Sequence, residues 1–283
     1  MSTMTIKTYN NIDIQLVGFG SFLATEGKGK QNIIDALKVG YNYIDTAYFY
    51  KNEEQIGEAI RDFGIDRKDL FLCSKVWPTM MGYEGTLDSF AKSTEMLGTD
   101  YLDMYLIHWP KKSMDDQNWK EYLQQTWKAM EELYNAGKVR VIGLSNFLPH
   151  HIRAILETAQ IKPMLNQLEL HVGYMQYEAV EYSKSMGMVV QAWSPLGRAR
   201  VIKDESVALL AEKYRRTPAQ ILLRFLVQQD IAVIPKASSV ERMKENMDIF
   251  DFEIEEDDMS FLKCLPQRGY SGEHPDYLGQ LLL

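Results

Sequence analysis

Residues 43–53 read Tyr43-Ile44-Asp45-Thr46-Ala47-Tyr48-Phe49-Tyr50-Lys51-Asn52-Glu53, a short apolar segment that ends in a carboxylate and continues into a loop with a phenol. Asn52 stands three residues before Gln55, which is the spacing of a capping box and predicts a helix start. Asp45 and Tyr50 are therefore predicted to lie on a strand-to-helix loop. In a parallel α/β protein such loops lie at the carboxyl edge of the sheet, where active sites are built.

The same strand-then-helix unit recurs along the chain, because short apolar segments alternate with segments of helical apolar spacing. The eight predicted strands are Leu16–Gly20, Tyr43–Asp45, Leu70–Val76, Leu102–Trp109, Val139–Ser145, Met164–Leu168, Met188–Trp193 and Ile231–Pro235. Crossovers between parallel strands are right-handed, so eight such units close most simply into a (β/α)8 TIM barrel. We predict this α/β fold as a single domain over residues 1–283, with an N-terminal β-hairpin over Thr5–Gln15 and extra C-terminal helices.

An open doubly wound sheet is the alternative fold, and the segment around the first predicted strand disfavours it. That fold usually carries three glycines in a phosphate-binding turn that opens a helix. Here Gly18 and Gly20 are followed by Leu23 at the third position, and no helical pattern starts at once. The barrel therefore remains the prediction.

Composition narrows the class of protein. The chain of 283 residues is 46% hydrophobic, which is enough for a large core, and it has no apolar run long enough to span a membrane. Two cysteines, Cys73 and Cys264, fit a reducing compartment, and the chain shows no zinc-type spacing, so we expect no metal. A net charge of -8 opposes nucleic-acid binding. We expect a cytoplasmic protein, a monomer or weak dimer, without nucleic-acid or membrane partners.

Ionisable residues recur at the ends of neighbouring predicted strands. Asp45 ends the second strand, and Lys75 and His108 lie near the ends of the third and fourth, so they should converge with Tyr50 at one edge. Tyr50 would donate a proton, and Lys75 would lower the tyrosine pKa from its usual value of about 10. Asp45 would hold Lys75 charged, and His108 would hydrogen-bond a substrate oxygen. The alternatives are a solvated rim lysine and a Schiff-base lysine, which Asp45 opposes.

Amides, hydroxyls and cations follow the later predicted strands. Ser145-Asn146, Asn166-Gln167 and Trp193-Ser194 could hold a carboxamide and give a flat ring an aromatic face. After the eighth strand, Ser238 and Ser239 are placed to cap a helix flanked by Lys236 and Arg242, a pattern typical of an anion site. An ordinary set of loop residues and a solvated helix end are the alternatives.

These segments together closely resemble the aldo-keto reductase family. The matching segments are Gly40–Ala47 with Tyr50 and Asn52-Glu53, Ser74–Trp77, Leu102–Pro110, Gly143–Phe147, Asn166-Gln167, Ser194–Leu196 and Ile234–Lys236, in one order along nearly the whole chain. The resemblance implies a (β/α)8 barrel that binds NADPH, with weaker use of NADH possible. It also implies reduction of a small-molecule carbonyl substrate through the tetrad Asp45, Tyr50, Lys75 and His108.

The resemblance also assigns cofactor and substrate contacts. Cofactor-binding residues by this match are Ser145, Asn146, Gln167, Trp193, Ser194, Leu196, Lys236, Ser238, Ser239, Arg242, Glu245 and Asn246. The substrate pocket would be lined by Phe22, Tyr48, Trp77 and Trp109. Trp193 stands where a tyrosine or phenylalanine is usual in the family. The implied activity is an NADPH-dependent carbonyl reductase; a nucleotide-binding regulatory protein with little turnover is the alternative, and a hydrolase or aldolase is a third.

Overall fold

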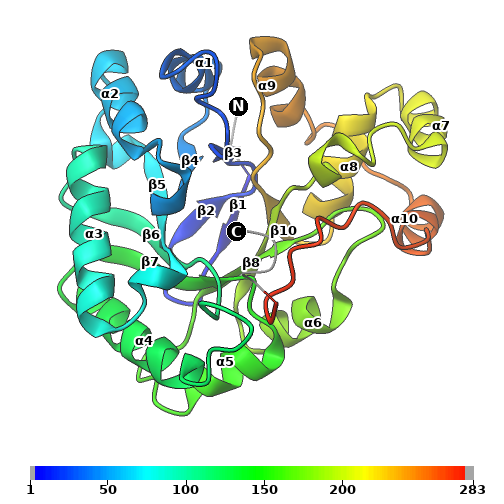
Figure 1. The fold of residues 1–283 in the computed structure, drawn as a ribbon. Helices are drawn as coiled ribbons and strands as arrows, with labels where there is room; N and C mark the ends of the chain where they lie inside the picture. The colour runs from blue at the N-terminus through cyan, green and yellow to red at the C-terminus, as the bar shows by residue number, and fades with distance from the viewer. Residues whose placement is uncertain (1–3, 278–283) are drawn as a thin grey trace.

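The computed structural model describes residues 4–277 and contains a parallel eight-stranded sheet rolled into a barrel (Figure 1). The strands follow one another in chain order and are β3 (Phe19–Gly20), β4 (Tyr43–Asp45), β5 (Phe71–Val76), β6 (Leu102–Ile107), β7 (Val139–Ser145), β8 (Leu165–Glu169), β9 (Val189–Trp193) and β10 (Ile231–Val233). A parallel bridge between Val17 and Val233 joins the first strand to the last, and Gly18 N donates to Val233 O at 2.9 Å. The predicted (β/α)8 barrel is therefore confirmed.

Helices surround the barrel in Figure 1. They are α1 (Gln31–Val39), α2 (Glu53–Phe63), α3 (Tyr83–Leu97), α4 (Trp119–Asn135), α5 (Pro149–Leu156), α6 (Tyr177–Ser185), α7 (Glu205–Tyr214), α8 (Pro218–Val227), α9 (Val240–Met247) and α10 (Glu256–Lys263). All side chains of β5, β6 and β8 are buried, as expected for strands covered on both faces. The predicted N-terminal hairpin is present as β1 (Thr5–Lys7) and β2 (Asp13–Gln15), which form a separate sheet.

The start of α2 differs from the prediction. The Asn52 side chain makes no capping hydrogen bond, so the predicted capping box with Gln55 is wrong. Instead, Asn52 Oδ1 accepts from Thr46 Oγ1 at 2.8 Å, and Asn52 Nδ2 donates to Ser21 O at 2.9 Å. The buried amide thus ties the loops after β3 and β4 together, and this positions the short 3-10 turn Tyr48–Tyr50 above the barrel.

The segment that follows α10 returns toward the barrel, coloured red in Figure 1. Ser271 donates through N and Oγ to the buried Glu169 carboxylate at the end of β8, at 3.0 and 2.6 Å. Farther along, Glu273 pairs with Arg198 at 2.7 Å. These contacts hold the segment at the carboxyl edge of the strands. Within the described part of the chain, no helix has the length and apolar character needed to cross a membrane.

Candidate active site

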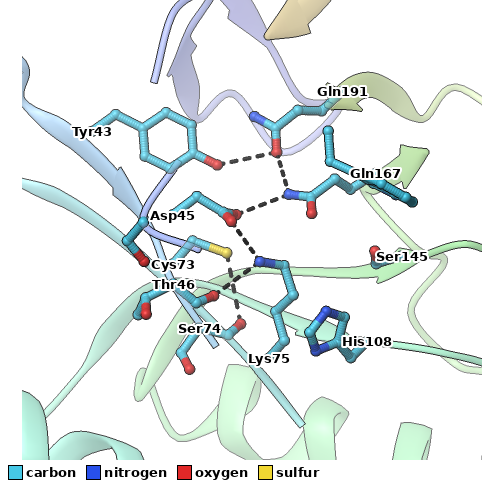
Figure 2. Close-up of polar contacts among 12 residues, drawn as sticks. Tyr43, Asp45, Thr46, Cys73, Ser74, Lys75, His108, Ser145, Gln167 and Gln191 are labelled. Carbon is cyan, nitrogen blue, oxygen red and sulfur yellow. Dashed lines mark hydrogen bonds and ion pairs between the residues drawn. The ribbon is translucent and has the colours of Figure 1, made fainter. Parts of the chain in front are cut away.

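An ion pair between β4 and β5 lies at the centre of the site (Figure 2). Lys75 Nζ lies 2.5 Å from Asp45 Oδ1, and it also donates to Thr46 O at 2.9 Å. Both side chains are buried, with exposed fractions of 0% and 2%. Burial acts to lower the pKa of Lys75, but the charge and hydrogen bond of Asp45 together with the nearby Tyr50 and Cys73 outweigh burial, so the net pKa is raised. The amine therefore stays an ammonium, which opposes Schiff-base chemistry because that chemistry needs a neutral amine.

Tyr50 lies next to this pair, on the 3-10 turn that follows β4. The Lys75 Nζ atom is 5.1 Å from the centroid of the Tyr50 ring. Burial raises the pKa of Tyr50 to about 12, while the Lys75 charge acts in the opposite direction. The predicted net lowering of the tyrosine pKa is therefore wrong, because desolvation of the phenolate exceeds the attraction of the ammonium. Tyr50 is thus a protonated phenol at neutral pH.

His108 follows β6 and faces the same space. Its ring lies 5.6 Å from the Tyr50 ring and 5.1 Å from the Trp77 ring, both edge-on. Burial, and then the Lys75 charge, hold the pKa of His108 well below its usual range. The imidazole is therefore neutral and keeps one N–H donor. Its buried Nδ1 has no hydrogen-bond partner among the described residues.

The four predicted catalytic residues thus meet at one cavity of about 780 Å³. Asp45, Tyr50 and His108 line it, and the buried Lys75 lies behind them. Tyr50 is the one tyrosine among the described residues that line this cavity. The arrangement places a protonated phenol and a neutral imidazole at the same wall, with a fixed positive charge behind them. Such a wall can bind and protonate an oxygen that gains negative charge.

Most of the predicted cofactor residues line the same cavity. They include Ser145, Asn146, Gln167, Trp193, Ser194 and Leu196 from the ends of β7, β8 and β9. Lys236, Ser238, Arg242, Glu245 and Asn246 line it from the segment after β10 and from α9. The cavity therefore has polar groups that can bind a carboxamide at the ends of β7, β8 and β9, and positively charged side chains near the start of α9.

Among the predicted cofactor residues, Ser239 and Asn146 have hydrogen-bond partners in the segments that surround the cavity. Ser239 does not line the cavity, because it is the N-cap of α9 and its Oγ accepts from Arg242 N at 3.4 Å. Asn146 lines the cavity, but its Nδ2 donates to His108 O at 3.1 Å and its Oδ1 accepts from Trp193 Nε1 at 2.7 Å. Asn146 therefore also holds the indole of Trp193 in place.

The substrate side of the cavity is aromatic. Phe22, Trp77 and Trp109 line it as predicted, but Tyr48 does not. The residue that sequence reasoning missed is Phe49, whose ring stacks on Trp77 with a centroid separation of 3.8 Å. In a 3-10 turn successive side chains point about 120° apart, so neighbouring aromatic residues face different surroundings. The sequence gives no signal that would choose Phe49 over Tyr48.

Two polar side chains that the sequence did not single out, Tyr43 and Gln191, lie deeper in the barrel behind the predicted Gln167. Gln167 Nε2 donates to Asp45 Oδ2 at 2.9 Å and to Gln191 Oε1 at 2.7 Å. Tyr43 Oη donates to the same Gln191 oxygen at 3.1 Å (Figure 2). Tyr43 precedes Asp45 by two residues on β4, and side chains two apart on a strand share a face. Gln191 likewise precedes Trp193 by two residues on β9. The alternation of side chains along β4 and β9 could therefore have predicted that Tyr43 and Gln191 face the same interior as Asp45 and Trp193.

A cluster of possible metal ligands lies apart from the tetrad, at His150, His151 and Asp276. Asp276 Oδ1 lies 3.0 Å from His151 Nε2 and 2.8 Å from Lys111 Nζ. The backbone N of Leu148 donates to His151 Nδ1 at 3.2 Å, so the ring proton of neutral His151 is on Nε2, facing Asp276. A cation would have to displace both this proton and the Lys111 ammonium. The cluster therefore suits attachment of the C-terminal segment to α5 rather than metal binding.

Comparisons with known proteins agree on one family. The model of the Aldo/keto reductase family matches residues 28–265. Glyoxal reductase of Bacillus subtilis (strain 168) is 42% identical over 275 residues, which cover 97% of each chain. Morphine 6-dehydrogenase of Pseudomonas putida is 35% identical and covers 91% of this chain, which spans 89% of that protein. An aldo/keto reductase from Brucella melitensis has a solved structure with a TM-score of 0.87 and 38% identity, covering 93% of this chain and 99% of its own.

Proposed function

Because the chain belongs to the aldo/keto reductase family and is an oxidoreductase of the carbonyl–alcohol couple, we propose that it is an NADPH-dependent carbonyl reductase with Tyr50 as the proton donor. The observation that carries the proposal is the buried pair of Lys75 and Asp45 beside Tyr50, the one tyrosine among the described cavity residues. A charge fixed at this place favours negative charge on the phenol oxygen after the proton has left.

The residues of the cavity fit a phosphorylated nicotinamide dinucleotide. Gln167 has both amide hydrogens engaged with Asp45 and Gln191, so its carbonyl is the atom free to accept from a carboxamide. Trp193, held by Asn146, presents an indole to a flat ring. Lys236 and Arg242 supply positive charge at the start of α9, which suits an adenosine phosphate. When bound there, the reduced cofactor supplies a hydride to the carbonyl carbon.

The chain's own groups would perform the proton chemistry. Tyr50 gives its proton to the substrate oxygen, and Lys75 stabilises the phenolate that remains. The neutral His108 donates a hydrogen bond to the same oxygen and so orients the carbonyl. Asp45 keeps the ammonium charged and aimed. A neutral imidazole is suited to orientation and is a poor source of the proton itself.

The cavity lining supports an uncharged, largely apolar substrate. Phe22, Phe49, Trp77 and Trp109 offer aromatic surface near Tyr50. Among the charged residues of the cavity lining, Arg198 and Glu273 neutralise each other. Binding an anionic or strongly hydrated carbonyl compound here would strip its water without returning matching hydrogen bonds. We therefore expect aromatic and alkyl aldehydes to be reduced with a higher kcat/KM than sugars.

A panel assay of NADPH oxidation tests this proposal, with Tyr50→Phe as the test variant and Tyr48→Phe as its matched control. Tyr50→Phe should lose on the order of 100-fold or more in kcat, because the general acid is gone, and should still bind NADPH. Tyr48→Phe should keep most of the activity, since Tyr48 lies outside the described cavity lining. Near-normal turnover by Tyr50→Phe, or no reduction of any carbonyl by the wild-type protein, would refute the proposal.

A further inference from the structure

Three polar side chains form a continuous hydrogen-bonded chain that ends at the catalytic carboxylate. Tyr43 donates to Gln191, Gln167 donates to Gln191, and Gln167 also donates to Asp45 (Figure 2). They come from β4, β8 and β9, so the chain crosses the interior of the barrel. Gln167 and Gln191 have exposed fractions of 1% and 0%, and Tyr43 is equally buried.

The negative charge of Asp45 fixes the direction of every bond in this chain. A carboxylate accepts hydrogen bonds only, so Gln167 must turn its amide nitrogen toward Asp45. The second hydrogen of that nitrogen then points at Gln191, so the Gln191 carbonyl oxygen must be the acceptor. If the Gln191 amide were reversed, two nitrogen donors would face each other at 2.7 Å. In the observed orientation both hydrogens of the Gln167 nitrogen and the Tyr43 hydroxyl meet an acceptor, while Gln191 Nε2 has no hydrogen-bond partner among the described residues.

The orientation of the Gln167 amide decides which of its atoms, the carbonyl oxygen or the nitrogen, faces the cavity. With its nitrogen held by Asp45 and Gln191, the Gln167 Oε1 atom points away from Gln191 (Figure 2), and Gln167 lines the cavity. Asp45 alone would still attract one hydrogen of the amide. The Gln191 carbonyl engages the other hydrogen and so restricts rotation of the amide plane. Without it, the Gln167 carbonyl would be free to leave the direction of the cavity.

The packing around Tyr43 holds the far end of this chain. A Cβ atom at Gly18 would lie 2.4 Å from Tyr43 Cδ1, so the ring occupies space that only glycine leaves open. On another side, the ring meets Phe71 edge-on with a centroid separation of 4.9 Å. Tyr43 is thus fixed in position, and its hydroxyl holds the Gln191 carbonyl where Gln167 needs it.

We propose that Gln191 is a positioning residue that acts through Gln167: it fixes the Gln167 carbonyl toward the cavity and thereby makes the site select a cofactor with a carboxamide N–H. Tyr43 supports Gln191 in this role. The inference deepens the proposed function and rests on it, since it takes the nicotinamide carboxamide to be the partner of Gln167. It assigns neither Gln191 nor Tyr43 any contact with the reacting atoms.

Calorimetric titration with two oxidised cofactors tests this role. NADP⁺ has the carboxamide, whereas its 3-acetylpyridine analogue keeps the carbonyl oxygen but lacks the N–H₂ group. Wild-type protein should prefer NADP⁺. Gln191→Met should bind NADP⁺ on the order of 10-fold more weakly, which corresponds to the loss of one hydrogen bond between Gln167 and the carboxamide. It should bind the analogue with the same Kd as the wild type. Gln191→Glu keeps an acceptor oxygen at this position and should restore the preference, and Tyr43→Phe should give a smaller loss than Gln191→Met.

The comparison of two cofactors separates positioning from damage to the fold. A variant that is partly unfolded loses binding sites for both cofactors alike, so the ratio of the two Kd values reports on Gln167 alone. Equal weakening of both cofactors by Gln191→Met would overturn the inference, as would unchanged binding of both. The proposed function fails by a different result, which is a wild-type protein that binds NADP⁺ but reduces no carbonyl compound with NADPH.

Discussion

Replacing Lys75 by methionine should destabilise the protein strongly, because it leaves the Asp45 carboxylate buried without its counter-charge. The two groups are 2.5 Å apart and nearly inaccessible to solvent. Removing one partner of a buried pair costs about 3–5 kcal/mol, because the remaining charge keeps its desolvation penalty. Gln167 would still donate to Asp45 Oδ2, which compensates for a single hydrogen bond and not for a charge.

The double variant with Asp45→Asn and Lys75→Met should recover most of this loss. No net charge then remains buried, and an asparagine oxygen can still accept from Gln167. Relative to a neutral lysine beside Asp45, the Lys75 ammonium should stabilise the fold throughout the neutral range. The pKa of Lys75 is raised in the folded protein, so its contribution is complete below the ordinary lysine pKa of about 10.4 and is lost only as the pH rises toward the folded value.

Urea unfolding, followed by intrinsic fluorescence, measures these differences. We expect the midpoints of the wild type and the double variant to lie close together, with the midpoint of Lys75→Met well below both. Both variants should lack reductase activity, since neither has the ammonium beside Tyr50, so stability alone distinguishes them. Two results would refute the reasoning: a Lys75→Met protein as stable as the wild type, or a double variant no more stable than Lys75→Met.

Three further predictions follow from the site. Between about pH 6 and 8 the kcat of carbonyl reduction should be flat, because burial and then the Lys75 charge keep the pKa of His108 well below its usual range; an inflection near 6.5 would contradict this. Arg242→Ala should lower the preference for NADPH over NADH by a factor on the order of 10, measured as the ratio of the two Kd values in titrations of each cofactor. Equal losses of affinity for NADPH and NADH would contradict a contact between Arg242 and the phosphate. Gly18→Ala should cost about 1–3 kcal/mol in urea unfolding, because its Cβ would overlap the Tyr43 ring, and a wild-type midpoint would contradict it.

The strands and the tetrad could be predicted because both depend on local periodicity. Asp45, Lys75 and His108 lie at or next to the ends of β4, β5 and β6, and parallel strands bring those ends to one edge. The pairing register offsets Asp45 on β4 from Lys75 on β5, and the sequence does not show this offset. Asp45 pairs with Cys73, so Lys75 lies two positions farther along its strand and still reaches Asp45 with its long side chain. A lysine has the length to span this offset, which is why the prediction survives it.

Features that depend on packing between distant elements could not be predicted. The Asn52 amide matched a local capping pattern, yet it bonds Ser21 O and Thr46 Oγ1 because those loops close over it. The pKa of Tyr50 depends on a balance between burial and the Lys75 charge, and only the structure gives the extent of burial. The choice of Phe49 over Tyr48 for the cavity wall depends on one rotation of a 3-10 turn.

The barrel cannot close during synthesis until its last strand has been made. The first strand segment bonds the last, through Val17 and Val233, so it has no partner on that side until β10 has been made. At translation rates of about 5–20 residues per second, this interval is on the order of 10 s or longer. During that time the nascent chain carries an open strand edge, the kind of surface that pairs with other chains. The strand segment around Val17 thus exposes its unpaired side for most of the time that synthesis of the chain takes.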